Sequence, residues 1–120
     1  MTRIRLSLLA AAALAAAVLA STAFAREARG LKGEVYPNFK IEFTNNGRAV
    51  KTLKAGTHTI KIEDKSSIHN FHLVGPGVNR STSVSFTGER SWRVTLKPGK
   101  YTFMCDPHAQ SMRGSFRVTR

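Results

Sequence analysis

The stretch from Cys105 to Met112 carries three side chains that bind soft metal ions. It holds a thiol at Cys105, an imidazole at His108 and a thioether at Met112, in the spacing Cys-x2-His-x3-Met. Thiolate and thioether ligands select copper over magnesium, and two histidines, one cysteine and a weak axial methionine form the trigonal arrangement of blue copper centres. The sequence therefore predicts a copper site that uses these three side chains and needs one further histidine.

Cys105 is the only cysteine of the chain. A single cysteine excludes an intramolecular disulfide and any cluster or zinc site that needs several thiolates. A lone buried cysteine usually packs as a small hydrophobic residue, and Met112 could fill the core in the same way. An unpaired thiol is an oxidation hazard outside the cytoplasm, however, and binding a metal is one reason to retain it. The spacing to His108 and Met112 favours the metal site.

The missing histidine has to come from the three that lie upstream. His58 lies between two threonines and far from other soft ligands, so we interpret it as structural. His69 and His72 both lie in the run 68–74, where residues three apart on a strand face opposite sides and cannot easily bind one metal. His69 shares its parity with the more apolar face, so we expect His69 to be the ligand and keep His72 as the alternative. Asn70 could hydrogen-bond across to the thiol-bearing loop and hold the site closed.

Short strands must position these side chains. Beyond residue 30 no helical periodicity is sustained, and short alternating runs recur between Gly, Pro and Asn. Such runs at spacings of about ten residues are typical of an antiparallel β-sandwich, here of seven to eight strands. Cys105 shares strand parity with the aromatic residues before it, so its thiol should point inward. The expected strands are Phe39–Phe43, Thr57–Asp64, Ile68–Val74, Ser83–Phe86, Arg90–Leu96, Tyr101–Cys105 and Ser115–Thr119.

Residues 1–25 read as a signal peptide that precedes a single domain at 26–120. A short basic start is followed by an uncharged Ala/Leu run, and Ala23-Phe24-Ala25 supplies the small-x-small pattern that signal peptidase accepts. We expect cleavage before Arg26 and a soluble mature chain in the periplasm or secreted from the cell. An uncleaved membrane anchor is the alternative, because twenty uncharged residues can just cross a bilayer.

The chain is strongly basic. It has 19 Lys and Arg against 7 Asp and Glu, a formal net charge of +12 that becomes +10 without the first 25 residues. A basic surface can steer a protein toward an acidic partner. Nucleic acid is disfavoured because the chain is exported and carries no binding motif. At 120 residues the chain is too short for a two-domain enzyme.

The motifs resemble a known family. Tyr-Thr-Phe-Met-Cys-Asp-Pro-His, followed by Met-Arg-Gly and preceded by His-Asn, is similar to the plastocyanin/azurin type of cupredoxins, above all plastocyanin, pseudoazurin and amicyanin. The resemblance spans 34–119. It implies a Greek-key β-sandwich that carries electrons with one type 1 copper per chain. Matched residue by residue, it implies His69, Cys105, His108 and Met112 as the copper ligands, and it places the family's asparagine on Asn70.

These features together predict a small electron carrier. No general base, nucleophile or substrate cleft is visible, and four protein ligands leave no open position for a substrate, so we expect no enzymatic activity. We expect a monomer that exchanges single electrons with redox partner proteins, whose docking surfaces could be acidic. The alternative is a periplasmic protein that buffers or delivers copper without an electron-transfer role.

Overall fold

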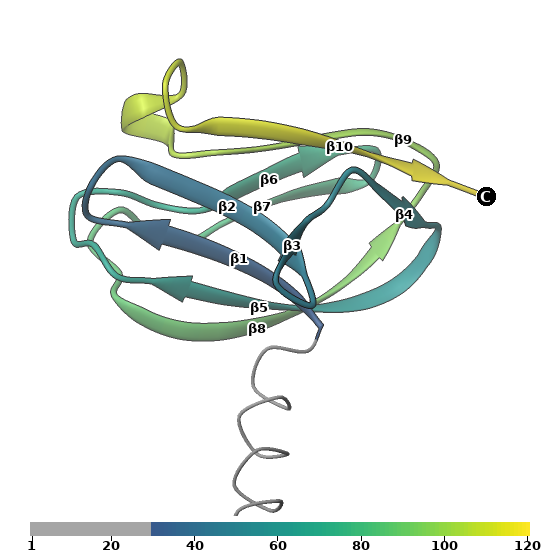
Figure 1. Cartoon of the computed structure of the whole chain (residues 1–120), viewed down its shortest axis with the longest axis horizontal. Helices are drawn as coiled ribbons and strands as arrows, with labels where there is room; N and C mark the ends of the chain where they lie inside the picture. Colours follow the sequence, from purple (N-terminus) through teal and green to yellow (C-terminus); the bar gives the residue numbers. More distant parts are fainter. Residues whose placement is uncertain (1–29) are drawn as a thin grey trace, which may run out of the picture.

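The computed structural model describes residues 30–120, which form two facing β-sheets (Figure 1). The first sheet has the strand order β3-β2-β1-β5-β8 and the second has the order β4-β10-β9-β6-β7. The predicted all-β sandwich is confirmed. The described part of the chain holds ten strands, because six of the seven expected runs form strands and four others, at 31–36, 48–49, 52–54 and 78–81, were not expected. The strands are β1 (Leu31–Tyr36), β2 (Lys40–Asn45), β3 (Arg48–Ala49), β4 (Thr52–Lys54), β5 (Gly56–Asp64), β6 (His72–Gly75), β7 (Val78–Ser81), β8 (Gly88–Leu96), β9 (Gly99–Met104) and β10 (Arg113–Thr119).

The pairing of the strands brings distant parts of the chain to one end of the sandwich. β1 pairs antiparallel with β2 and parallel with β5, so the β1–β2 turn and the chain after β5 leave the first sheet at the same end. β9 pairs antiparallel with both β6 and β10, which puts His72 and Arg113 on either side of Met104. The Cys105 loop, which joins β9 to β10, therefore lies at that end too (Figure 1).

Aromatic rings from both sheets fill the space between them. Phe71 stacks on Phe103 with ring centroids 5.9 Å apart, and Phe43 contacts Phe116 at 4.7 Å. Alternation along β9 and β10 buries Phe103 and Phe116 and leaves the neighbouring side chains more exposed. Gly114 makes room for the packing, because a Cβ at that position would overlap the ring of Phe103. The tight packing of β9 against β10 fixes the strand that ends at the thiol.

Three of the predicted strands are wrong in detail. The strand predicted over Phe39–Phe43 begins only at Lys40, so Phe39 lies in the turn before β2. Ser83–Phe86 is a turn, closed by the Phe86 amide donating to the Ser83 carbonyl at 3.1 Å. The strand predicted over Ile68–Val74 begins only at His72, so His69 lies in the loop between β5 and β6. The backbone N–H of Phe71 donates to the Thr82 hydroxyl at 3.0 Å, so a side chain takes the place of a neighbouring strand as its partner.

Within residues 30–120, no helix is long and apolar enough to span a membrane. The predicted leader at 1–25 lies outside the residues that the structure describes.

Candidate metal centre

Three donor atoms from two separate segments of the chain meet at the end of the sandwich. Cys105 Sγ lies 3.6 Å from His69 Nδ1 and 3.7 Å from His108 Nδ1, and the two imidazole nitrogens are 3.1 Å apart. The point equidistant from these three atoms lies about 2.0 Å from each, close to the 2.0–2.3 Å typical of bonds from first-row metals to nitrogen and sulfur. The triangle therefore fits a single metal ion.

The Cys105 loop positions two of the donors. Cys105 follows the last residue of β9 and keeps the inward parity of the strand, so its side chain is fully buried. A short 3-10 turn, Asp106–His108, comes next, with Pro107 in its first turn. The His108 amide donates to the Cys105 carbonyl at 3.0 Å, which folds the chain back on itself. This turn brings the His108 imidazole next to the thiol.

Met112 lies at the neck of the same loop. Its amide donates to the His108 carbonyl at 2.8 Å, and its carbonyl accepts from the Cys105 amide at 3.0 Å. The side chain is almost completely buried. β10 then begins at Arg113, which pairs with Met104. The loop is thus closed by backbone hydrogen bonds between Cys105, His108 and Met112.

Asn70 fastens the His69 segment to the Cys105 loop. Its amide nitrogen donates to the Asp106 carboxylate at 2.8 Å and to the Thr82 carbonyl at 3.1 Å, and its amide oxygen accepts from the Asp106 backbone N–H at 2.8 Å. Asn70 and Thr82 are both buried. These hydrogen bonds hold the residues next to His69 and Cys105 against each other.

His72 is not part of the donor group. Its Nδ1 is 2.7 Å from an Asp106 carboxylate oxygen, and its Nε2 is 2.6 Å from the Asn79 side-chain oxygen. Acceptors at both ring nitrogens suit a protonated imidazole. Burial opposes the charge on His72, but the hydrogen bonds to Asp106 and Asn79 outweigh it and raise the pKa of His72. Burial likewise acts to raise the pKa of Asp106, and the bonds from His72 and Asn70 reverse this and lower it.

The electrostatics of His69 differ from those of His72. Burial lowers the pKa of His69, and the neighbouring His108 lowers it further. A hydrogen bond with the backbone of Pro37 opposes these two effects without reversing them. A neutral imidazole is the form that binds metals, so the surroundings of His69 favour a metal-binding state.

Three residues near the donors escaped the sequence analysis. The Phe39 ring lies 4.8 Å from the His69 ring and 5.0 Å from the His108 ring. Asp106 joins Asn70 and His72, and Thr82 anchors the segment of Asn70. The adjacency of Asp106 to Cys105 was a usable signal, whereas an exposed Phe39 and a distant Thr82 offered none.

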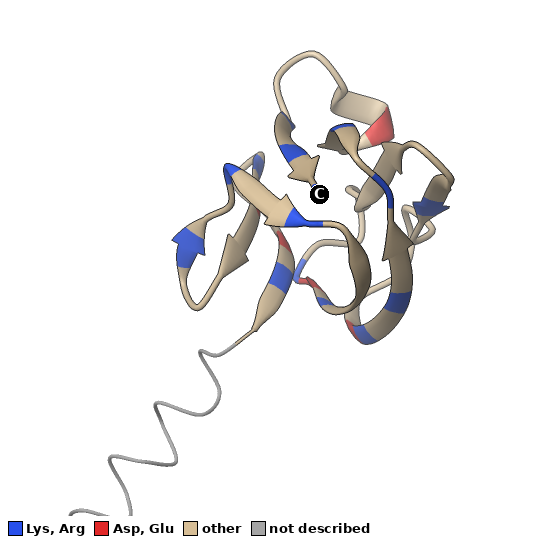
Figure 2. Cartoon of the chain, turned by 90° about the vertical axis from the view of Figure 1, so that its right-hand side faces the viewer, with Lys and Arg blue, Asp and Glu red and all other residues tan. Residues whose placement is uncertain are grey.

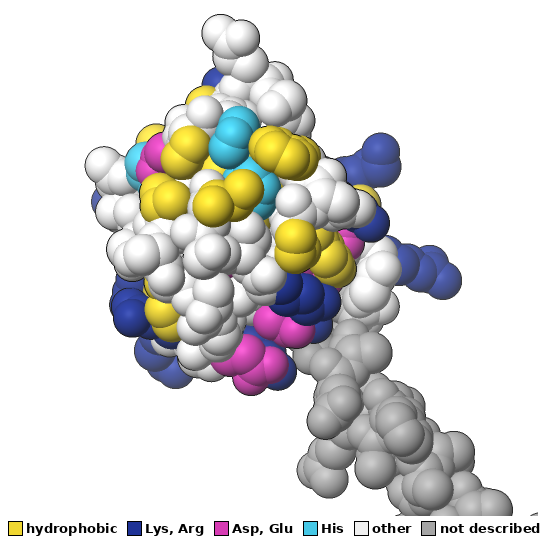
Figure 3. Space-filling view, turned by 90° about the vertical axis from the view of Figure 1, so that its left-hand side faces the viewer, with side chains coloured by type: hydrophobic (Ala, Val, Ile, Leu, Met, Phe, Trp, Pro, Cys, Tyr) yellow, Lys and Arg dark blue, Asp and Glu magenta, His cyan; other side chains and the backbone are white. Residues whose placement is uncertain are grey.

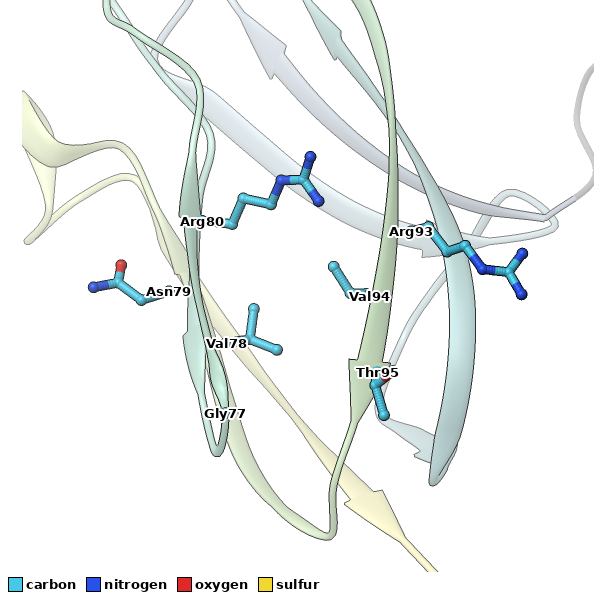
Figure 4. A pocket seen from close by; sticks show the side chains of 7 residues that line it. All are labelled: Gly77, Val78, Asn79, Arg80, Arg93, Val94 and Thr95. Atoms are coloured by element: carbon cyan, nitrogen blue, oxygen red, sulfur yellow. The ribbon is translucent and has the colours of Figure 1, made fainter.

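A groove that is separate from the donors opens between the two sheets, toward the end opposite the Cys105 loop. It measures about 290 Å³, lies along the edge strands β7 and β8, and is lined in part by Val78, Arg80 and Val94 (Figure 4). None of its lining residues is a thiol, an imidazole or a carboxylate. The turn at 75–77 belongs to this end, because Tyr101 donates its hydroxyl to the Pro76 carbonyl at 2.7 Å. A docking face around His108 therefore does not include that turn.

Comparisons with known proteins agree with the geometry. Residues 33–119 match the family described as copper binding proteins, plastocyanin/azurin family. No curated protein sequence matches the chain. Among solved structures, a Met-to-Gln mutant of rusticyanin is 17% identical with a TM-score of 0.58, and the match covers 85% of this chain and 94% of that one.

Two further structures share the fold. Rusticyanin from Thiobacillus ferrooxidans is 21% identical with a TM-score of 0.52, over 74% of this chain and 75% of that one. An oxidised Met-to-Leu mutant of amicyanin is 17% identical with a TM-score of 0.51, over 75% and 82%. The His69, Cys105 and His108 group is compatible with one type 1 copper. On the sequence match over 33–119, the chain belongs to the plastocyanin/azurin family of copper-binding proteins.

Proposed function

We propose that the protein is an exported blue copper protein that carries single electrons between redox partners. The observation that carries this proposal is the triangle of Cys105 Sγ, His69 Nδ1 and His108 Nδ1, whose sides of 3.1–3.7 Å fit one ion. When bound there, copper supplies reversible one-electron chemistry. The protein residues hold the donors in one arrangement, so little rearrangement accompanies the change of oxidation state.

Met112 is the proposed fourth ligand, weak and axial. Its burial and its backbone hydrogen bonds with both Cys105 and His108 support this role. Asn70 is the proposed support, because it ties Asp106 to the His69 segment. With every ligand supplied by the chain, no coordination position is left for a substrate, so we propose no catalytic activity.

Electrons enter and leave through His108 in this proposal. His69 and Cys105 are fully buried, whereas His108 is only partly buried. Two exposed apolar residues adjoin the donors, each with 54% of its surface accessible. The Phe39 ring contacts the His108 ring, and Ile68 precedes His69 in the sequence. Figure 3 shows histidine side chains among hydrophobic ones on this end of the molecule. A small apolar face of this kind suits the brief encounters of redox proteins.

The second sheet supplies a charge that suits an acidic partner. Its five strands contain Lys54, Arg80, Lys100, Arg113 and Arg117 and no Asp or Glu. Lys100 and Arg117 lie directly opposite each other in the β9–β10 ladder, where like charges destabilise a sheet. Figure 2 shows basic positions on these strands.

The first sheet is different in its charge balance. Every described acidic residue except Asp106 lies on its strands, and several form ion pairs there, such as Lys61 with Glu89 at 3.1 Å and Lys40 with Glu42 at 2.9 Å. The net positive field therefore comes mainly from the second sheet. We propose that this sheet steers a redox partner with an acidic surface, to which the monomer docks transiently.

We propose that residues 1–25 are a signal peptide that directs the mature chain to the periplasm or out of the cell. Mass spectrometry of protein purified from its host should give a mass that starts at Arg26. A chain that retains Met1 and stays with the membrane would contradict export with cleavage.

The ligand set is tested by colour. Copper-loaded protein should be intensely blue or green, because a Cu(II)–thiolate bond absorbs visible light by charge transfer. His69→Ala should abolish the normal spectrum, and the matched variant His72→Ala should leave it nearly unchanged. A colourless copper-loaded protein would favour a buffering or delivery role without Cu(II)–thiolate coordination. The opposite result for the two histidines would move the ligand to His72.

The electron-transfer role needs a kinetic test. Reduced protein should transfer electrons to hexacyanoferrate(III), an anion, at a rate that falls as salt is added, because screening removes the attraction. A cationic cobalt(III) complex should show the opposite salt dependence. The double variant Lys100→Glu with Arg117→Glu should lower the rate with the anionic reagent, relative to the cationic one, more than Arg48→Glu on the first sheet does. A blue protein that exchanges electrons with neither reagent would refute the carrier role.

A further inference from the structure

Phe39 has an unusual backbone for an aromatic residue. It lies in the turn between β1 and β2 with φ +62°, in the left-handed region. The other described non-glycine residue with positive φ is Asn46, at +51°. Asparagine tolerates this region, whereas for a bulky side chain it is strained. Strain of this kind persists where the surrounding structure compensates for it, often at functional sites.

The core does not provide that compensation. Phe39 is 54% exposed and does not belong to the hydrophobic core. Its ring instead contacts the rings of two donors, at 4.8 Å and an interplanar angle of 68° to His69 and at 5.0 Å and 86° to His108. The two imidazoles are themselves 4.8 Å apart at 75°. The three rings form a nearly equilateral triangle of edge-to-face contacts, a favoured geometry for aromatic pairs.

This triangle has a consequence for access to the donors. His69 is completely buried although it lies in a loop at the end of the sandwich, and Phe39 is the half-exposed residue packed against it. Phe39 thus lies between solvent and a donor, and it contacts both imidazoles at once. Its ring can limit the movement of each imidazole relative to the other.

We propose that Phe39 is a positioning residue that closes the metal centre to small ligands and holds the two imidazoles at their mutual distance. This inference rests on the proposed function for the identity of the metal and the ligands. It assigns to the β1–β2 turn, which supplies no donor, the task of keeping water and small anions from the centre.

The turn's backbone allows a sharp test. Phe39→Gly removes the ring and also relieves the strain at positive φ, whereas Phe39→Ala removes the ring and keeps the strain. The glycine variant should therefore be at least as stable to heat as the alanine variant while opening the centre equally. Phe39→Leu retains an apolar cover and should behave more like the wild type. Ile68→Ala is the control, because Ile68 has the same exposure and adjoins His69 without an aromatic ring.

Copper-loaded proteins are then treated with azide and, separately, with EDTA. Azide should leave the visible and EPR spectra of the wild type and Ile68→Ala unchanged and should alter those of Phe39→Gly and Phe39→Ala. Loss of copper to EDTA should be about tenfold faster or more in the two ringless variants, which corresponds to about 1.4 kcal/mol at the barrier. Ringless variants that match the wild type in both assays would overturn the proposal, even if partner reactions slow.

A metal-free arm separates this inference from the proposed function. Diethylpyrocarbonate modification of His69, mapped by mass spectrometry, should be slow in the wild type and Ile68→Ala and faster in both ringless variants. If the wild type takes up no coloured copper, the proposed function fails, and this arm still decides whether Phe39 covers His69. Equal modification rates in all variants would refute the covering role whatever the copper result.

Discussion

Replacing Asn70 with alanine should weaken the fold and the metal centre together. The Asn70 side chain makes three hydrogen bonds, two to Asp106 and one to the Thr82 carbonyl, and is itself buried. A neutral hydrogen bond contributes about 1 kcal/mol net and one to a charged group about 1.5–3 kcal/mol. The Asp106 carboxylate is half exposed and keeps its bond to His72, which reduces the charged contribution. We expect Asn70→Ala to lower the free energy of unfolding by about 2–4 kcal/mol.

Urea unfolding of metal-free and copper-loaded protein provides the assay. In a thermal experiment, each kcal/mol of stability lost should lower the melting temperature by roughly 4–8 °C in a domain of this length. The copper-loaded protein should lose at least as much stability as the metal-free protein, because a ligand that binds only the folded state adds stability that rises with the logarithm of its affinity. Loosening the Cys105 loop from the His69 segment should lower that affinity.

A matched variant separates the fastening role from the loss of an amide. Asn79→Ala removes an exposed asparagine with one side-chain hydrogen bond, to His72. We expect it to change the stability by no more than about 1 kcal/mol. If Asn70→Ala were as mild as Asn79→Ala, or if it spared copper affinity entirely, the reasoning about Asn70 would be refuted.

The remaining predictions concern single donors and one ion pair. Cys105→Ser should lose the colour even if metal still binds, and a blue variant in absorption spectroscopy would end the type 1 assignment. Met112→Leu should keep copper and colour and raise the potential measured by voltammetry, because an axial donor that favours Cu(II) is lost; complete loss of copper would contradict the axial role. The pKa of His72 is raised above 6.5, so its pairing with Asp106 stabilises the fold fully below pH 6.5, and this stability is lost as the pH rises through the raised value. The difference in stability between wild type and His72→Gln, at most about 1 kcal/mol for a half-exposed partner, should therefore shrink from pH 6 to pH 9 in urea unfolding, and a difference that grew would refute the pairing.

The part of the site that lies in one short stretch was the part open to sequence analysis. Cys105, His108 and Met112 follow one strand, and their spacing alone names a soft-metal loop. The inward direction of Cys105 followed from the alternation of β9, because burial of one face fixes strand parity. The structure brings these residues together through backbone hydrogen bonds inside the loop. Local sequence was therefore sufficient to place them.

The His69 segment shows where such reasoning stops. The sequence analysis placed His69 on a strand, yet the chain there bonds to the side chain of Thr82 and, through Asn70, to Asp106. These partners lie 11 or more residues away along the chain, so no local pattern contains them. The preference for His69 over His72 used parity on a strand that does not extend so far. Phe39 was missed for a related reason, because its alternation with Ile41 and Phe43 predicted a place on a strand, whereas the residue lies in the turn before β2.

The donors of the centre come from connections that only the complete sandwich brings together. His69 lies in the crossing from the first sheet to the second, Cys105 and His108 lie in a loop of the second sheet, and Phe39 comes from a turn of the first. A partly folded chain with either sheet alone cannot assemble the three rings and the thiol. Binding of a metal by such a site draws on the folding of the whole domain. Copper should therefore stabilise the entire sandwich, including strands that supply no ligand.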